Sequence, residues 1–297
     1  MKKRLNVQIH YAAMVAPGFI WLFMFSIVPL VGIIMAFQDF NPGLGYMKSD
    51  WVGLENFKYL FSMSDSKQVM INTIVIAVAK MIFNLLVPLI FALMLNEVRH
   101  QRYKKAVQTI VYLPHFLSWV ILASIILNIF GYKGVANAVT AMFGAEPKIF
   151  FQDEKIFRQL IVSTDVWKEF GYNAVIFLAA LTGVSPSLYE AAAIDGAGRM
   201  KSTWHITLPE LIPTIVLLSV LGLGNVLNAG FDQVFNLYNK LVYSTGDILD
   251  TWVYRMGLLD LQFSLATTAG LLKSAVSFVL IVSSYVIAYK AADYKVF

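Results

Sequence analysis

Six long apolar runs constrain the fold of this chain more than any other feature. A helix needs about 20 mostly apolar residues to cross the hydrocarbon core of a membrane. Backbone groups in lipid find no water to bond, and only helices and closed barrels satisfy them there. The runs therefore predict an all-α integral membrane protein with six transmembrane helices, at about residues 11–37, 70–95, 107–130, 160–181, 212–231 and 267–289.

Composition supports the membrane prediction and excludes several function classes. Only 14% of the 297 residues are charged, whereas an ordinary soluble domain carries roughly 25%. The net charge of +5 is scattered over the ends of the apolar runs, so we expect no nucleic-acid partner, which would need a concentrated basic stripe. The chain has no cysteine and four dispersed histidines, so we expect no metal site and no catalytic residues.

The first apolar run is a membrane helix by this reasoning and not a signal peptide. It extends over residues 11–37, whereas the apolar core of a signal peptide has about 7–15 residues. We therefore predict one transmembrane domain over residues 1–297. It consists of an N-terminal helix at about 11–37, core helices within about 70–289, and a loop at 182–211.

The distribution of charge predicts which way the chain crosses the membrane. Cytoplasmic segments are rich in Lys and Arg. If the N-terminus is inside, the inner segments hold 11 Lys and Arg and 5 acids, and the longer outer segments hold 9 and 11. We therefore predict a multi-pass membrane protein with both termini and the 182–211 loop in the cytoplasm.

The 182–211 loop has the pattern of two short helices joined by a tight turn. A strong helix-forming run at 189–194 follows Ser185-Pro186-Ser187, which is a good helix start. Asp195-Gly196 predicts a turn. A second amphipathic run at 199–207 is expected to end before Leu208-Pro209. The small, alanine-rich face of the first helix fits a groove in another protein.

The same loop resembles the EAA motif of permeases from ATP-driven (ABC) importers. The matching positions keep that motif's spacing without a gap: Glu190, Ala191, Ala192, then Gly196, Ile206, Leu208 and Pro209. Three further segments resemble the corresponding segments of permeases of the maltose and glycerol-phosphate type: Trp51 to Phe57, Tyr112-Leu113-Pro114 and Trp167 to Gly171. Residues 38–42 and 230–233 resemble the subgroup for oligosaccharides and polysaccharide fragments.

The resemblance implies a location in the bacterial inner membrane and a division of labour between subunits. Glu190 and its neighbours, with Asp195 and Gly196 at the turn, would form a coupling helix that docks on a cytoplasmic ATPase. The implied partners are a second, related permease, two copies of the ATPase, an extracytoplasmic sugar-binding protein, the sugar and membrane lipid. The chain has no Walker A pattern, so ATP and Mg would be used by the partner ATPase and no cofactor by this chain.

Polar residues inside the apolar runs are the candidates for the substrate pathway, because such residues are costly in lipid. Lys80 and Asn84 share one helix face. Lys80 either faces the pathway or pairs with a carboxylate or carbonyl of a neighbouring helix. The remaining candidates are Trp167, Tyr172, Asn173, Asn225, Asn228 and Lys273.

Each of these candidates also has a structural interpretation. In one interpretation, Trp167 or Tyr172 stacks on a sugar ring while Asn173 bonds its hydroxyls. In the other, the aromatic residues mark the membrane interface. Asp165 and Lys168 can pair at i,i+3, which would make them a self-neutralising structural set. Gly222 and Gly224 let helices pack closely.

Two other functions remain open at this stage. An ion-driven transporter or channel would share the membrane helices, and a non-transporting anchor would share the docking loop. Neither the identity nor the charge of the sugar follows from the sequence, and Lys80 and Lys273 leave an acidic sugar open.

Overall fold

The computed structural model describes residues 2–224 and 226–292, and the side chains of 10–224 and 226–286. Nearly all of this part is helical. Its only strands are β1 (Gln38–Asp39) and β2 (Asp50–Trp51), an antiparallel pair with Asp39 opposite Asp50. The chain forms two compact units: one extends to Met63 and includes Val253–Leu272, and the other includes Ser64–Trp252 and the chain from Lys273 onward.

The first unit begins with a long apolar helical stretch. Helix α1 (Lys2–Leu22) continues through the π-helical turn η1 (Phe23–Ile27) into the 3₁₀ helix η2 (Val28–Phe37). Most large apolar side chains from Tyr11 to Val31 are exposed. Because water would disfavour such a surface, this stretch is suited to a lipid environment.

The rest of the first unit is a compact group of short elements. It contains β1, α2 (Gly45–Lys48), β2, α3 (Glu55–Ser62), the π-helical turn η7 (Arg255–Leu259) and the start of α15 (Phe263–Ala292). The Asn56 amide donates to the carbonyl oxygens of Ala36 (3.0 Å) and Gln38 (2.9 Å). The Ser264 hydroxyl accepts from the Phe40 backbone N–H at 2.9 Å. Residues distant in sequence therefore fix the end of η2.

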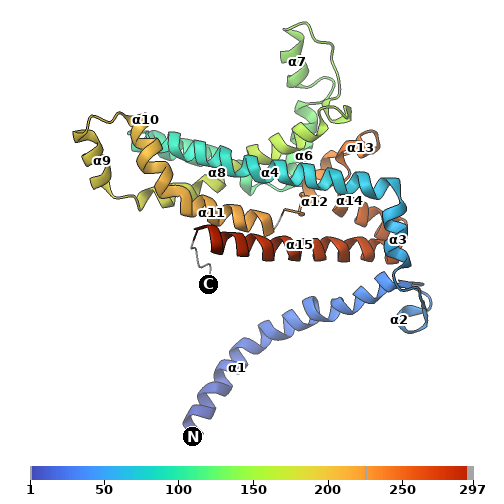
Figure 1. Ribbon diagram of the computed structural model, residues 1–297. Helices are drawn as coiled ribbons and strands as arrows, with labels where there is room; N and C mark the ends of the chain where they lie inside the picture. Colours follow the sequence, from blue (N-terminus) through green and yellow to red (C-terminus); the bar gives the residue numbers. More distant parts are fainter. Residues whose placement is uncertain (1, 225, 293–297) are drawn as a thin grey trace. The chain divides into compact units, whose positions relative to one another are not determined.

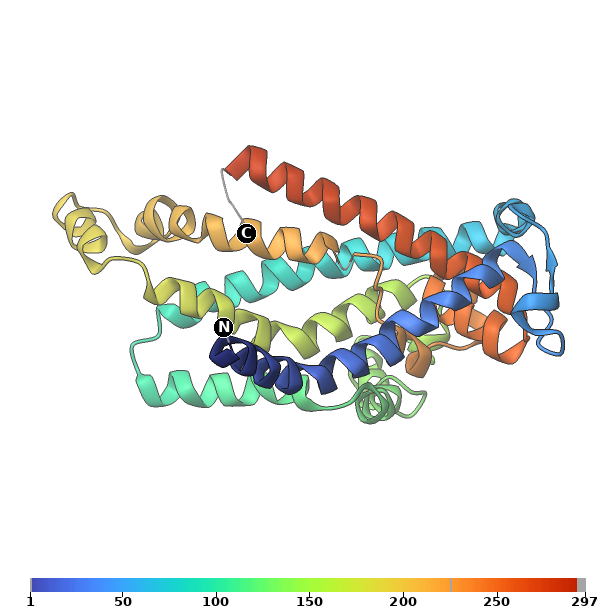
Figure 2. The same ribbon diagram turned by 90° about the horizontal axis from the view of Figure 1, so that it is seen from below.

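The second unit is a bundle whose long helices run alongside one another (Figure 1). The short helices α9 and α10 lie at one end of this bundle, and α12, α13 and α14 lie at the other (Figure 2). Its elements, besides most of α15, are α4 (Ser64–Asn96), α5 (Gln101–Tyr112), η3 (Leu113–Phe116), α6 (Trp119–Ile129), α7 (Val135–Ala141), η4 (Phe150–Gln152), α8 (Phe157–Thr182), α9 (Pro186–Ile194), α10 (Arg199–Ser202), η5 (Thr203–Thr207), α11 (Leu208–Gly224), α12 (Phe231–Leu237), η6 (Lys240–Val242), α13 (Tyr243–Gly246) and α14 (Leu249–Tyr254).

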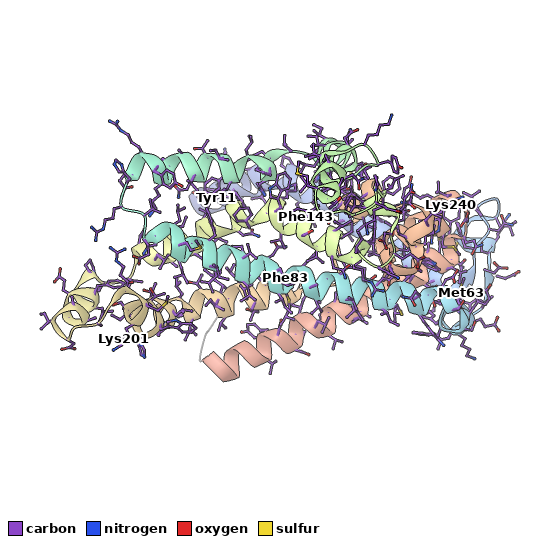
Figure 3. The ribbon with its side chains drawn as sticks, turned by 90° about the horizontal axis from the view of Figure 1, so that it is seen from above. Tyr11, Met63, Phe83, Phe143, Lys201 and Lys240 are labelled. Atoms are coloured by element: carbon purple, nitrogen blue, oxygen red, sulfur yellow. The ribbon has the colours of Figure 1, made fainter. Side chains whose placement is uncertain are left out.

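Exposed charged side chains lie at both ends of this bundle, and exposed apolar ones lie between them. Lys201 lies at the end formed by α9 and α10, Lys240 lies at the opposite end, and Phe83 of α4 lies between them (Figure 3). Phe83, Ile90 and Met94 of α4 are exposed. This distribution is the one expected of helices that cross a bilayer.

Glycines set the closest helix contacts in the second unit. A Cβ on Gly171 of α8 would lie 2.3 Å from the carbonyl oxygen of Val111 on α5. On α11, a Cβ at Gly222 would lie 3.2 Å from Met81, and one at Gly224 would lie 3.3 Å from Ile281 of α15. The prediction that Gly222 and Gly224 allow close helix packing is consistent with these distances.

The number of membrane spans is the point where sequence and structure differ most. Four helices in the described part are long and apolar enough to cross a membrane. The number of candidate spans rises to six if each of two bent helix pairs is counted as one span. The predicted third span, 107–130, is not one straight helix. It bends by 104° between η3 and α6, because Pro114 lies in the 3₁₀ turn and Ser118 starts a new helix as its N-cap.

The fifth predicted span, 212–231, also differs from the structure. Helix α11 is described as far as Gly224, residues 226–230 are not helical, and α12 begins at Phe231. Gly230 has a left-handed backbone (φ 92°), which breaks the helix before α12. The break brings the segment that contains Asn228 and Ala229 back toward α4, where the candidate site lies.

Asn137 holds the loop between α6 and α8. Its amide donates to the carbonyl oxygens of Gly131, Tyr132 and Lys148, and its Oδ1 accepts from the Lys148 backbone N–H at 3.0 Å. These four bonds satisfy a side chain that is only 4% exposed. The loop therefore has a defined conformation.

The same loop ends in a small turn built on Asp153. The Asp153 carboxylate accepts from the Lys148 ammonium at 2.8 Å and from the Lys155 backbone N–H at 3.0 Å. Both bonds favour the charged carboxylate, so they hold the pKa of Asp153 below its ordinary value.

Candidate functional site

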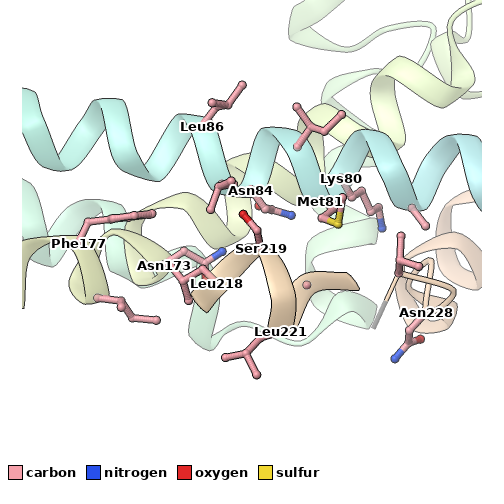
Figure 4. A pocket seen from close by; sticks show the side chains of 16 residues that line it. Lys80, Met81, Asn84, Leu86, Asn173, Phe177, Leu218, Ser219, Leu221 and Asn228 are labelled. Atoms are coloured by element: carbon pink, nitrogen blue, oxygen red, sulfur yellow. The ribbon is translucent and has the colours of Figure 1, made fainter. Parts of the chain in front are cut away.

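A cavity of about 470 Å³ lies in the second unit, between α4, α8, α11 and the segment before α12 (Figure 4). Its polar lining residues are Lys80, Asn84, Asn173, Ser219 and Asn228. The rest of the lining is mostly apolar. Lys80 lies near the middle of the 33-residue helix α4, so the cavity lies far from both ends of the bundle.

Lys80 is the centre of a buried polar network. Its ammonium donates to the carbonyl oxygen of Ala229 at 2.8 Å and to Oε1 of Gln233, and it lies 3.0 Å from Oδ1 of Asp165. Gln233 is fully buried, and its amide donates onward to α8 at the Ile161 carbonyl oxygen. Lys80 therefore ties α4 to α8 and to the start of α12.

The partner of Asp165 differs from the sequence prediction. The spacing allowed Asp165 to pair with Lys168 one turn away, but the structure gives each of them another partner. Lys168 instead bonds Glu169 and the His115 carbonyl oxygen. Asp165 faces α4 because helix rotation, which local spacing does not determine, places it beside Lys80. Of the two interpretations of Lys80, pairing with a carboxylate of a neighbouring helix agrees with this contact.

Asp165 also fixes the side chain of Asn84. Asn84 Nδ2 donates to Asp165 Oδ2 at 2.8 Å. Asn84 Oδ1 is buried and has no hydrogen-bond partner among the described residues. A buried amide oxygen that is left unsatisfied is energetically costly, so the Asp165 contact fixes Asn84 at the expense of its other polar atom.

The two remaining candidate amides of the described chain also line the cavity. Asn173 is half-buried on α8, and Asn228 is exposed in the segment before α12. Sugar hydroxyls both donate and accept hydrogen bonds, and so do amides. Lys80, Asn84, Asn173 and Asn228 are thus brought together by the fold, whereas Asn225 lies outside the described residues.

Three other candidates lie elsewhere. Trp167 lines a separate, mainly apolar groove along α4 and α8. The ring of Tyr172 stacks on the His115 imidazole, with centroids 3.9 Å apart. Lys273 forms an ion pair with Asp250 of α14 at 2.5 Å. Nothing in this arrangement directs these three side chains into the cavity.

Gln233 is a member of this network that sequence reasoning did not single out. It lies in the 230–233 segment that carried the subgroup resemblance. Its polar side chain in a motif beside an apolar run was the one signal that could have singled out Gln233. The contact itself could not be predicted, because its partner Lys80 is 153 positions away in the sequence.

The 182–211 loop has the predicted helix–turn–helix form. Ser185 is the N-cap residue of α9, Pro186 is its first residue, and Gly196 has φ +71° in the turn before α10. The Tyr189 hydroxyl lies 3.0 Å from the Thr207 hydroxyl and joins the two helical segments. Glu190, Ala191, Asp195 and Gly196 are exposed, and Ala192 is half-buried.

The end of the second helical segment differs from the prediction. We expected it to stop before Leu208-Pro209, but α10, η5 and α11 are continuous from Arg199 to Gly224. In the π-helical turn η5, the Leu208 N–H bonds the Thr203 carbonyl oxygen. This wider turn precedes Pro209, which has no N–H and is tolerated at the start of α11. Ile206, Leu208 and Pro209 therefore belong to one continuous helical segment that leads to the cavity.

Comparisons with known proteins identify the family. A family profile described as "Binding-protein-dependent transport system inner membrane component" matches residues 85–293. The chain belongs to this family.

Relatives in this family are similar over nearly the whole chain. Protein LplB of Bacillus subtilis (strain 168) is 42% identical, over 92% of this chain and 86% of that protein. The polygalacturonan/rhamnogalacturonan transport system permease protein YteP of the same organism is 40% identical, over 98% of this chain and 92% of that protein.

A solved structure confirms the fold. A chain of a bacterial ABC transporter involved in the import of the acidic polysaccharide alginate superposes with a TM-score of 0.90 at 34% identity, covering 97% of this chain and 98% of that chain. As a member of the binding-protein-dependent transport family, the protein is an inner-membrane permease subunit of an ABC importer. It is not an enzyme, because a partner subunit hydrolyses ATP.

Proposed function

We propose that the chain forms half of a membrane pathway for an oligosaccharide, and that its 182–211 loop couples the pathway to two copies of a cytoplasmic ATPase. The observation that carries the substrate class is the cavity at mid-length of α4. Three amides, of Asn84, Asn173 and Asn228, line it among apolar residues. Planar amides are suited to the many hydroxyls of a saccharide, and transporter sites lie near the membrane midplane between helices.

The printed functions of the relatives support the same class. One is a polygalacturonan/rhamnogalacturonan permease, and a structural neighbour imports alginate. Another similar structure is that of a bacterial alginate ABC transporter in complex with an alginate pentasaccharide-bound periplasmic protein. An extracytoplasmic binding protein that delivers an oligosaccharide is therefore the expected partner on the outer side, and a related second permease completes the pathway.

The exposed surface of the loop is suited to an ATPase cleft. Ile194, Met200 and Trp204 are 87%, 71% and 62% exposed. Large apolar side chains exposed on a charged loop are typical of protein interfaces. Docking there would cover them together with Glu190 and Ala191.

The helices attached to the loop provide the mechanical connection. The continuous helical segment from Arg199 to Gly224 joins the loop to the cavity lining at Ser219. At the other side, the Arg199 guanidinium lies 3.7 Å from the Glu97 carboxylate at the end of α4. A movement of the loop would thus be transmitted to both α11 and α4, which border the cavity, as alternating access requires.

Uptake by the complete transporter in proteoliposomes tests this proposal. We expect ATP-dependent accumulation of oligosaccharide that requires the loaded binding protein. Uptake that continues without ATP but stops when the ion gradients are dissipated would favour the ion-driven alternative. Intact ATPase binding with no uptake of any saccharide would favour the anchor.

A further inference from the structure

The segment that joins α4 to α5 carries a concentrated positive charge. Its four basic residues are Arg99, Arg102, Lys104 and Lys105. All of them are exposed except Lys104, which is half-buried. None of these four side chains has an ion-pair or hydrogen-bond partner among the described residues. The nearest acid in the sequence is Glu97, whose carboxylate instead faces Arg199 at 3.7 Å. The charge of the segment is therefore not paired within the described chain.

An exposed apolar face of α5 and η3 begins directly beside these charges. Tyr103, Ile110 and Leu113 are 62%, 70% and 63% exposed. Positions seven or eleven apart lie on nearly the same face of a helix, so Tyr103 is in line with Ile110, and Arg102 is in line with Leu113. A tyrosine at the boundary between charged and apolar surface is typical of a membrane interface. This face is therefore suited to lipid headgroups at its start and to hydrocarbon farther along.

A phospholipid matches both parts of this surface. Its phosphate accepts hydrogen bonds from guanidinium and ammonium groups, and its acyl chains cover apolar side chains that would be unfavourable in water. Clustered Lys and Arg next to a membrane helix attract anionic headgroups more strongly than zwitterionic ones. We propose that residues 99–105 bind the headgroup of an anionic phospholipid, whose acyl chains lie along Tyr103, Ile110 and Leu113. This inference goes beyond the proposed function, because it does not depend on the transported substrate.

The site lies beside the coupling loop, so a cytoplasmic ATPase is the main alternative occupant. Glu97, at the end of α4, contacts Arg199 next to the turn of the 182–211 loop. The position of Arg102 favours lipid. It belongs to α5 itself and is in line with Leu113, about 16 Å farther along the helix. Arg102 therefore lies on the side of the bundle that lipid covers. A bound headgroup would hold the end of α4 at the membrane surface beside the coupling loop.

The experiment counts the lipids that stay bound to the complete transporter. The transporter is reconstituted in nanodiscs of equal parts phosphatidylglycerol and phosphatidylcholine, and native mass spectrometry counts each lipid that is retained after release. The test variant is Arg99→Gln/Arg102→Gln/Lys105→Gln. Each Lys or Arg near the headgroups contributes about fivefold to affinity, so removal of three should weaken binding at this site by on the order of 100-fold. We expect the variant to lose at least one phosphatidylglycerol per transporter.

Two matched variants separate the charge of this segment from charge in general. The first removes the same charge from three exposed residues outside the segment: Lys133→Gln/Lys155→Gln/Lys240→Gln. The second exchanges Arg and Lys at the three test positions and so keeps their charge. Both should retain the wild-type number of phosphatidylglycerol molecules. Co-purification with the ATPase reports on assembly. If the test variant does not assemble, Arg102→Gln alone replaces it, and phosphatidylglycerol should then bind about fivefold more weakly.

The results distinguish the possible occupants. The inference is overturned if the test variant retains as much phosphatidylglycerol as the wild type, or if the variant outside the segment loses the same amount. It is also overturned if the test variant binds the ATPase more weakly than the wild type in pure phosphatidylcholine, because the segment would then dock the ATPase. The lipid counts do not depend on sugar uptake. A transporter that takes up no saccharide would therefore refute the proposed function and leave this inference standing.

Discussion

Gly196 in the turn of the 182–211 loop gives a prediction that isolates one physical cause. Its backbone has φ +71°, and a Cβ built there meets no atom within 4 Å. A substitution is therefore disfavoured only by backbone conformation. For an L-residue the left-handed conformation costs roughly 1–2 kcal/mol. That cost lowers the population of this turn, relative to other conformations of the loop, by roughly 5- to 30-fold.

The matched control lies two residues away. Gly198 has φ −76°, and a Cβ there also meets nothing within 4 Å. We expect Gly196→Ala to weaken the affinity of the reconstituted permease pair for the ATPase by up to the same 5- to 30-fold, and Gly196→Val to weaken it further. Gly196→Asn should be milder, because Asn adopts the left-handed region more readily. Gly198→Ala should be close to wild type.

The assay is a titration of purified ATPase onto proteoliposomes that contain the permease pair and binding protein, with ATP hydrolysis as the readout. The reasoning is refuted if Gly196→Ala and Gly198→Ala weaken the affinity equally. The two glycines differ in their backbone φ angle, whereas both have room for a Cβ. It is also refuted if Gly196→Val assembles and transports at the wild-type rate.

Three further substitutions test the packing. Gly171→Ala places a Cβ 2.3 Å from the Val111 carbonyl oxygen, and overpacking of about 1–3 kcal/mol should lower the thermal unfolding temperature of the complex; an unchanged value would contradict the close contact. Asn137→Ala removes four hydrogen bonds, so limited proteolysis should cut this loop faster while the unfolding temperature hardly changes. Gly230→Ala combines φ +92° with a Cβ 2.8 Å from Lys80 Nζ, and uptake should fall although the complex assembles.

The elements that the sequence predicts best are those set by local composition. The apolar runs at 70–95 and 267–289 correspond to α4 and α15, because apolar content over about 20 residues specifies a membrane helix without reference to other helices. The turn at Gly196 was also predictable, since Asp-Gly is a strong local signal.

The remaining features depend on distant contacts. The pairing of Lys80 with Asp165 requires a particular rotation of α4 against α8, which no local pattern encodes. For the same reason, spacing within α8 suggested the wrong partner for Asp165. The non-helical segment 226–230 places Asn228 in the cavity lining, and the Ala229 carbonyl oxygen accepts from Lys80. These contacts are visible only in the folded chain.

The most direct test of the account is a tagged purification from gently solubilised native membranes, followed by ATPase measurements on the assembly. We predict that a second permease and an ABC ATPase co-purify, and that saccharide-loaded binding protein stimulates hydrolysis. If the chain purifies without an ATPase, or if no loaded binding protein changes the rate, the coupling role of the 182–211 loop is contradicted.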